Sequence, residues 1–136
     1  MRNFVDVLIE ECKKKITCTT GKECNRETAW KELDRIFTKA QINRQNKNKI
    51  LSGYNGNPNY RISRGFAIAL GAAFEFQIEE MNAFLSKAGY FLSGFHKEDR
   101  IIINLMSRRR HCTVNELNEA LEEQGLSLLT YRTKKV

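Results

Sequence analysis

The C-terminal half of the chain contains the same pattern twice, and this internal repeat limits the possible folds more than any other feature. Residues 78–92 (IEEMNAFLSKAGYFL) align without gaps on residues 114–128 (VNELNEALEEQGLSL) at an offset of 36. Identical residues coincide at several positions: Glu80 with Glu116, Asn82 with Asn118, Leu85 with Leu121, Gly89 with Gly125 and Leu92 with Leu128. A similar helical pattern precedes each copy, so the sequence predicts two helical hairpins. Two copies are too few for a self-standing solenoid.

The first hairpin lies in the most apolar stretch of the chain, residues 63–90. Ser63 is a good cap for its first helix, and Gly89 is expected to end its second. Its core residues recur at helical spacing: Phe66, Ala67, Leu70, Phe74, Ile78, Met81, Phe84, Leu85 and Ala88. In the second hairpin, Thr113 and Glu116 match a capping box, which predicts a helix start there.

Three more helices are predicted in the N-terminal half. The first spans Phe4–Lys14, and the second spans Arg26–Lys39. The third has Asn43 as its N-cap and runs to about Leu51, with an unusually polar sequence, RQNKNK. The core residues of the first two helices are Phe4, Val7, Leu8, Cys12, Trp30, Leu33, Ile36 and Phe37.

Two loops separate these helices. Residues 16–25 (ITCTTGKECN) are rich in Thr and contain Gly21, which predicts an inserted loop. Residues 53–62 contain two glycines and the single proline, Pro58, and predict a second loop. The fold class is therefore all-α with about seven helices in a single domain. Its expected parts are a core at 1–92, the second hairpin at 93–130 and a basic tail at 131–136.

Charge is distributed unevenly along the 136 residues, whose net charge is +7. Residues 1–62 hold 13 basic and 7 acidic side chains, whereas residues 63–136 hold 10 and 9. No acidic residue occurs between Asp34 and Glu75. A one-sided field of this kind attracts polyanions, because phosphate contacts release counterions. The alternative is a basic protein whose charge serves only solubility.

The beginning of the chain has Asp6 and no long apolar segment, so it does not match a signal peptide. No stretch approaches the length of a membrane span. We therefore expect a cytoplasmic protein without membrane contact, in which the four cysteines are reduced.

Metal binding and catalysis find little support in the sequence. Cys12, Cys18 and Cys24 are spaced C-x5-C-x5-C, and the short knuckle typical of zinc sites is absent. The two histidines, His96 and His111, are not part of any nucleophile or metal motif. We therefore expect no catalytic residues, no metal and no cofactor, and a protein that is not an enzyme.

Several short motifs are more specific than the general helical pattern. They are Ile42-Asn43-Arg44 with Lys49-Ile50, Asn57-Pro58-Asn59-Tyr60-Arg61, Ser63-Arg64 and Ala88-Gly89-Tyr90. Together with the pattern of residues 27–85, they resemble the phage-repressor-like helix-turn-helix family, of the Xre or lambda-repressor type. The closest likeness is to a subgroup that continues into a further helical hairpin. The sequence departs from this family in the loops at 16–25 and 53–56, and in the polar residues Asn46 and Lys47, where an apolar residue is expected.

The resemblance implies double-stranded DNA as the partner, with residues 43–51 as the recognition helix and Ile42 in the turn before it. Near the start of that helix, Arg44, Gln45 and Lys47 are best placed for base edges. Phosphate contacts are expected from Asn48 and Lys49, helped by side chains outside the helix. The full set of expected DNA-binding residues is Lys39, Asn43, Arg44, Gln45, Asn46, Lys47, Asn48, Lys49, Arg61 and Arg64.

The function predicted from these features is a DNA-binding regulator, of mobile-element or host-defence type. The alternative is a helical adaptor or a phage-encoded inhibitor in a bacterial defence or regulatory complex, without DNA binding. A homodimer is also expected from the resemblance, because such domains usually bind two half-sites. Ile101, Leu105 and Leu128 would supply its apolar surface.

Overall fold

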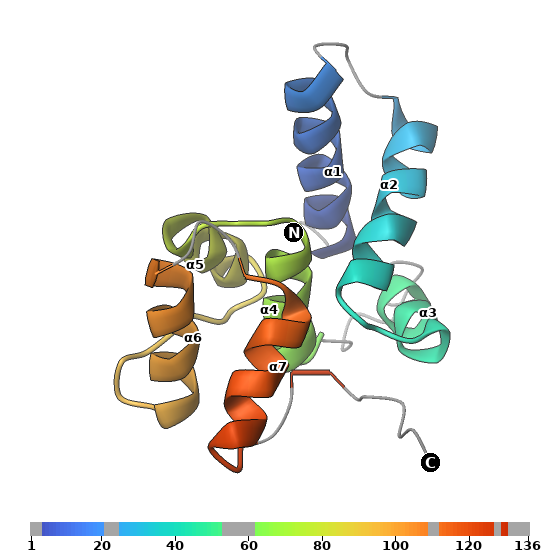
Figure 1. Cartoon of the computed structure of the whole chain (residues 1–136). Coiled ribbons are helices and arrows are strands. Elements are labelled where there is room, and N and C mark those ends of the chain that lie inside the picture. The colour runs from blue at the N-terminus through green and yellow to red at the C-terminus, as the bar shows by residue number, and fades with distance from the viewer. Residues whose placement is uncertain (1–3, 21–24, 53–61, 109–111, 127–128, 131–136) are drawn as a thin grey trace.

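The computed structural model describes residues 4–20, 25–52, 62–108, 112–126 and 129–130. Within these residues the chain forms seven helices and no strand, which confirms the all-α prediction (Figure 1). The helices are α1 (Phe4–Thr20), α2 (Arg26–Lys39), α3 (Arg44–Ser52), α4 (Arg64–Ala73), α5 (Ile78–Ser86), α6 (Lys97–Arg108) and α7 (Val114–Glu123). No helix of the described part is long and apolar enough to cross a membrane.

Helix α4 is the centre of the fold. It contacts α2, α5 and α7, while α1 packs along α2 and α6 packs against α5 and α7. Its residues from Ala67 to Ala73 are all buried, as in a helix surrounded by protein. A Cβ atom at Gly71 would collide with the side chain of Met81, so glycine lets α5 pack closely on α4.

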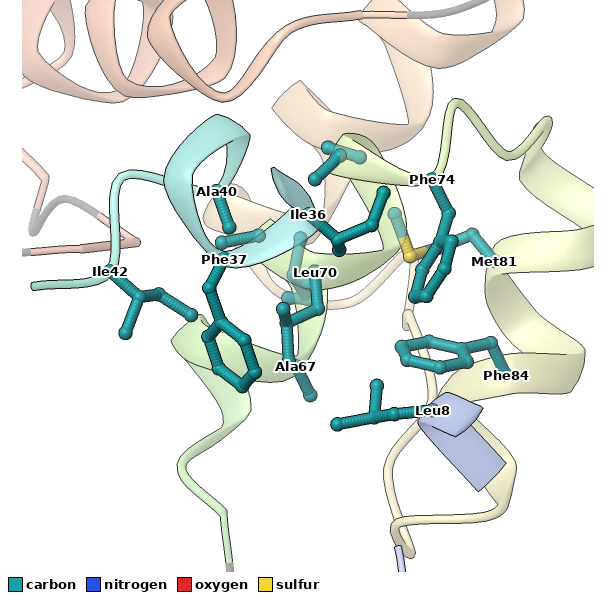
Figure 2. Packing of buried hydrophobic residues seen from close by; sticks show 14 of the residues in the cluster. Leu8, Ile36, Phe37, Ala40, Ile42, Ala67, Leu70, Phe74, Met81 and Phe84 are labelled. Atoms are coloured by element: carbon teal, nitrogen blue, oxygen red, sulfur yellow. The ribbon is translucent and has the colours of Figure 1, made fainter. Parts of the chain in front are cut away.

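Two groups of aromatic and aliphatic side chains pack on α4 (Figure 2). Phe37 from α2 and Ile42 from the turn after it lie beside Leu70. On the other side, the ring of Phe84 meets that of Phe74 edge-on, with 5.9 Å between the centroids. The predicted core residues of α1, α2, α4 and α5 belong to this cluster or pack against it.

Helix α1 is longer than predicted: it continues to Thr20, whereas the sequence predicted an end at Lys14. The predicted loop is therefore wrong for residues 16–20. Threonine lowers helix propensity by only a few tenths of a kcal/mol per residue. Packing on α2 outweighs this cost, since Ile16 packs against the core and Lys15 Nζ lies 3.5 Å from a carboxylate oxygen of Glu32. Residues 21–24 of that loop lie outside the described residues.

The two hairpins share details that the internal repeat predicted. Glu80 accepts a hydrogen bond from the Gln77 amide (3.1 Å), and Glu116 accepts one from the Thr113 amide (3.2 Å). Each residue therefore caps the start of its helix, α5 or α7. After these helices, Gly89 (φ 85°) and Gly125 (φ 70°) adopt the left-handed conformation that ends each copy.

Equivalent asparagines hold the segment that follows each hairpin. Asn82 Oδ1 accepts a hydrogen bond from the Leu92 amide at 3.3 Å. Asn118 Oδ1 accepts one from the Leu129 amide at 2.8 Å, and its Nδ2 donates to Thr130 Oγ1 at 3.2 Å. The side chain of Asn118 is fully buried, so these bonds satisfy polar groups inside the protein.

Several predictions fall outside the described residues. They concern the loop at 53–61 with Arg61, the basic tail at 131–136, the side chain of Cys18, and Cys24, His111 and Leu128.

Candidate nucleic-acid interface

Helices α2 and α3 are joined by a four-residue turn, residues 40–43. Gln41 has a φ of 59°, in the left-handed region, and this changes the chain direction between the helices. The Ile42 amide then donates to the Phe37 carbonyl at 3.2 Å, and the Ile42 side chain is buried. The turn is thus fixed to the core by an apolar side chain at its centre.

Helix α3 is short and is anchored mainly by its C-terminal end. Asn43 caps its start, because Asn43 Oδ1 accepts from the Asn46 amide at 2.8 Å, as predicted. Ile50 is buried and Leu51 is half-buried. Between the cap and these anchors lie six consecutive polar residues, 44–49. Figure 1 shows α3 at the outer edge of the molecule.

The side chains of these polar residues differ in exposure. Four of them are exposed and two are half-buried. The exposed ones are Arg44, Gln45, Asn48 and Lys49, and the half-buried ones are Asn46 and Lys47. Among the described residues, neither Arg44 nor Lys49 has a carboxylate within ion-pair distance. Both cations can therefore meet an anionic partner.

Lys47 has a different environment, because its Nζ forms an ion pair with Asp34 Oδ1 of α2. The Lys47 side chain is 24% exposed and that of Asp34 is 63% exposed. The two residues line a surface hollow between α2 and α3, together with Phe37, Thr38, Ile42 and Arg44. An apolar residue was expected at position 47, and the ion pair accounts for the lysine found there.

A second carboxylate meets the basic surface from another helix. Lys39 Nζ, at the end of α2, lies 3.8 Å from Glu75 Oε1, in the turn after α4. Asp34 and Glu75 are the two residues that bound the acid-free part of the sequence. In the fold, Asp34 pairs with Lys47 and Glu75 pairs with Lys39, and both lysines belong to the acid-free part. The surface is therefore less positive than the linear sequence suggests.

Arg64 has an internal partner. Its Nη2 donates to Asp99 Oδ1 at 2.6 Å and to the Phe91 carbonyl at 3.1 Å. Asp99 is 1% exposed, so the arginine compensates a buried charge. This structural role directs the Arg64 side chain to Asp99 and to the Phe91 carbonyl, away from the surface of α3.

The described surface thus brings together a subset of the expected DNA-binding residues. Asn43 to Lys49 lie together on α3 and its cap, and Lys39 lies at the end of the neighbouring α2. Arg61 lies outside the described residues. The pairing of Asp34 with Lys47 was not predictable from the sequence, although the position of Asp34 on α2, one turn before Thr38, was.

The structure offers little basis for a metal site. Cys12 and Cys112 are buried thiols on different helical units. Within the described residues, no three side chains of histidine, cysteine, aspartate or glutamate form a group that could hold a metal ion.

No family model, curated protein or solved structure matches this chain.

Proposed function

We propose that this protein binds double-stranded DNA, with α3 in the major groove and α2 across the backbone. The observation that carries the proposal is a short exposed helix with six consecutive polar residues, held at one end by Ile50 and at the other by the Asn43 cap. A helix that served only the core would use more of its surface for apolar contacts. The major groove admits a helix of this kind.

Arg44 and Gln45 are the residues assigned to base edges. Both are exposed in the first turn of α3, which is the part that contacts bases in helix-turn-helix proteins. Arginine pairs with guanine, and glutamine pairs with adenine, through two hydrogen bonds each. Lys49, in the last turn of α3, is assigned to a phosphate.

The direct test is fluorescence anisotropy with a labelled random-sequence duplex, at several salt concentrations. Lys49→Ala is expected to weaken binding and to lower the slope of log K against log [salt] by about one, because one phosphate contact is lost. The matched control is Lys97→Ala, which removes one exposed lysine from α6; Figure 1 shows this helix on the other side of α4 from α3. The control variant should bind DNA as the unmodified protein does.

Two results would overturn the proposal. One is the absence of binding to any duplex at about 50 mM salt, where phosphate contacts are strong. The other is an equal loss of affinity in the α3 variant and in the α6 control, which would show that the duplex is not bound at α3.

Sequence selectivity provides a separate test of the base contacts. Selection of duplexes from a random pool should give a preferred site for the unmodified protein. Arg44→Ala is expected to relax the preference at one base pair, at a cost of about 1–3 kcal/mol for the preferred site. A selected site unchanged by Arg44→Ala would remove this residue from the set that contacts bases.

A dimer would place two copies of α3 on half-sites about 34 Å apart, one helical turn of DNA. Sedimentation of the protein with a selected duplex measures this directly. A palindromic selected site with two chains bound is expected for a dimer, and a single short site with one chain bound would assign a monomer.

A further inference from the structure

The segment between the two hairpins exposes two large aromatic side chains. Phe91 is 69% exposed and Phe95 is 94% exposed, and these are the large apolar side chains that the described residues leave open to solvent. They are four residues apart, so their Cα atoms lie within about 14 Å of each other. Isolated exposed apolar residues are common, but two in one short segment indicate a contact surface.

The backbone of this segment is held by side chains from three helices. Arg64 of α4 donates to the Phe91 carbonyl (3.1 Å), and Asn82 of α5 accepts from the Leu92 amide (3.3 Å). Asp99 of α6 accepts from the Ser93 amide (2.7 Å). The two rings are therefore displayed by an ordered backbone, and a partner would not have to order it on binding.

The turn itself adds two more bonds. The Ser93 hydroxyl accepts from the Phe95 amide at 3.2 Å, and the Ser93 carbonyl accepts from the His96 amide at 3.3 Å. Asp99, buried at the centre of this network, binds both Arg64 and the Ser93 amide. Burying a carboxylate is costly without such partners, so these hydrogen bonds compensate the buried charge of Asp99 and at the same time hold the backbone of the segment.

Two exposed cations, Lys97 and Arg100, follow the segment in the first turn of α6, with one exposed acid, Glu98, between them. Lys87, before the segment, already lies 3.9 Å from Glu11 Oε1 of α1. A partner that buries the rings must face these cations, so its rim must be acidic. Helical segments with an apolar stripe and acidic flanks satisfy both conditions.

Two other occupants fit the surface less well. In a symmetric contact between two copies, Lys97 and Arg100 of one copy would face the same residues of the other, and like charges repel. Stable membrane attachment needs a long lipid chain with a polybasic patch, or two such chains. Two rings and two cations fall short of that.

We propose that Phe91 and Phe95 form a docking surface for an acidic amphipathic helix of another protein. This surface is separate from the α3 surface and does not depend on DNA binding. Its probe is a synthetic helical peptide of about 18 residues, with leucine at i, i+3 and i+4 positions and glutamate elsewhere. The comparison peptide has lysine in place of every glutamate.

Isothermal titration is expected to show the glutamate peptide binding at least about ten-fold more tightly than the lysine peptide. Phe91→Ser/Phe95→Ser should weaken that binding by about ten-fold or more, since each ring loses its buried area. Lys97→Glu/Arg100→Glu should reverse the peptide preference. The matched charge control, Lys31→Glu/Arg35→Glu on α2, changes two exposed cations outside both proposed surfaces and should leave the preference unchanged.

The serine variant should fold normally because both rings are exposed, and thermal unfolding monitors this. Equal affinity for the two peptides, no binding of the glutamate peptide, or binding unaffected by the serine changes would each overturn the proposal. Two further results would overturn it, each in the absence of peptide binding. One is a dimer in sedimentation that the serine changes abolish, and the other is adsorption to phosphatidylserine vesicles that the serine changes abolish. These two outcomes would assign the surface to a second copy or to a membrane.

Discussion

Lys47 on α3 forms an ion pair with Asp34 on α2, and both residues line the hollow between the two helices. The pair connects the proposed recognition helix to the helix before it. It also places a carboxylate, 63% exposed, at the edge of a surface proposed to face phosphates. A phosphate that approaches Lys47 must compete with this carboxylate.

Asp34→Asn is therefore expected to tighten binding to a random-sequence duplex, by about three- to ten-fold at low salt. The gain in affinity has two causes. Phosphates are no longer repelled by the Asp34 carboxylate, and Lys47 no longer has an ion-pair partner and can bind a phosphate. In a Lys47→Met background only the first cause remains, so the gain should be clearly smaller. Fluorescence anisotropy of the unmodified protein, the two single variants and the double variant gives the coupling between the two residues.

Glu79→Gln on α5, exposed and with the same change in charge, serves as the control and should leave affinity unchanged. Equal gains from Asp34→Asn in both backgrounds would show that Asp34 acts as a general charge and does not restrain Lys47. That result would leave the proposed DNA binding intact, whereas no binding by any of the variants would count against it.

The sequence predicted most of the fold because its information was local or repeated. The helix starts at Ser63, Thr113 and Asn43 follow from cap residues whose bonds are present in the structure. The two hairpins follow from the repeat. What the sequence could not predict were pairings between distant residues, such as Lys39 with Glu75, since these depend on how the helices pack.

The same reason explains the error in α1. Thr-rich segments are common in loops, and the pattern of residues 16–20 gives only a weak helical signal. The contact of Lys15 with Glu32 and the packing of Ile16 are tertiary effects that override this preference. Arg64 is a similar case: a basic residue beside the expected interface is directed to a buried aspartate by the position of α6.

Arg64→Met should destabilise the protein by about 2–4 kcal/mol, because Asp99 would remain buried without its counter-charge. The range lies below that for a fully buried pair, since the Arg64 side chain is 32% exposed. Urea unfolding followed by circular dichroism measures the change. Arg64→Lys keeps the charge and is expected to be milder; if both variants unfold like the unmodified protein, the ion pair contributes nothing to stability.

Gly65→Ala should also destabilise the protein, by about 1–3 kcal/mol. A Cβ atom at position 65 would lie 2.5 Å from the Leu129 carbonyl oxygen, which belongs to backbone and cannot rotate away. Gly94→Ala is the control, because a Cβ atom there meets nothing within 4 Å. In thermal unfolding, Gly65→Ala should therefore have a lower melting temperature than Gly94→Ala. Equal melting temperatures would contradict the close contact between α4 and residue 129.

The two equivalent asparagines should differ in their contribution to stability. Asn118→Ala removes a fully buried side chain that makes two hydrogen bonds, so the Leu129 amide and the Thr130 hydroxyl each lose a partner. The expected cost is about 2–3 kcal/mol. Asn82→Ala removes one bond of 3.3 Å from a half-buried side chain, and should cost about 1 kcal/mol or less. Urea unfolding of both variants measures the difference directly. An equal cost for the two would mean that the repeated asparagine has one structural role in both hairpins, regardless of its burial.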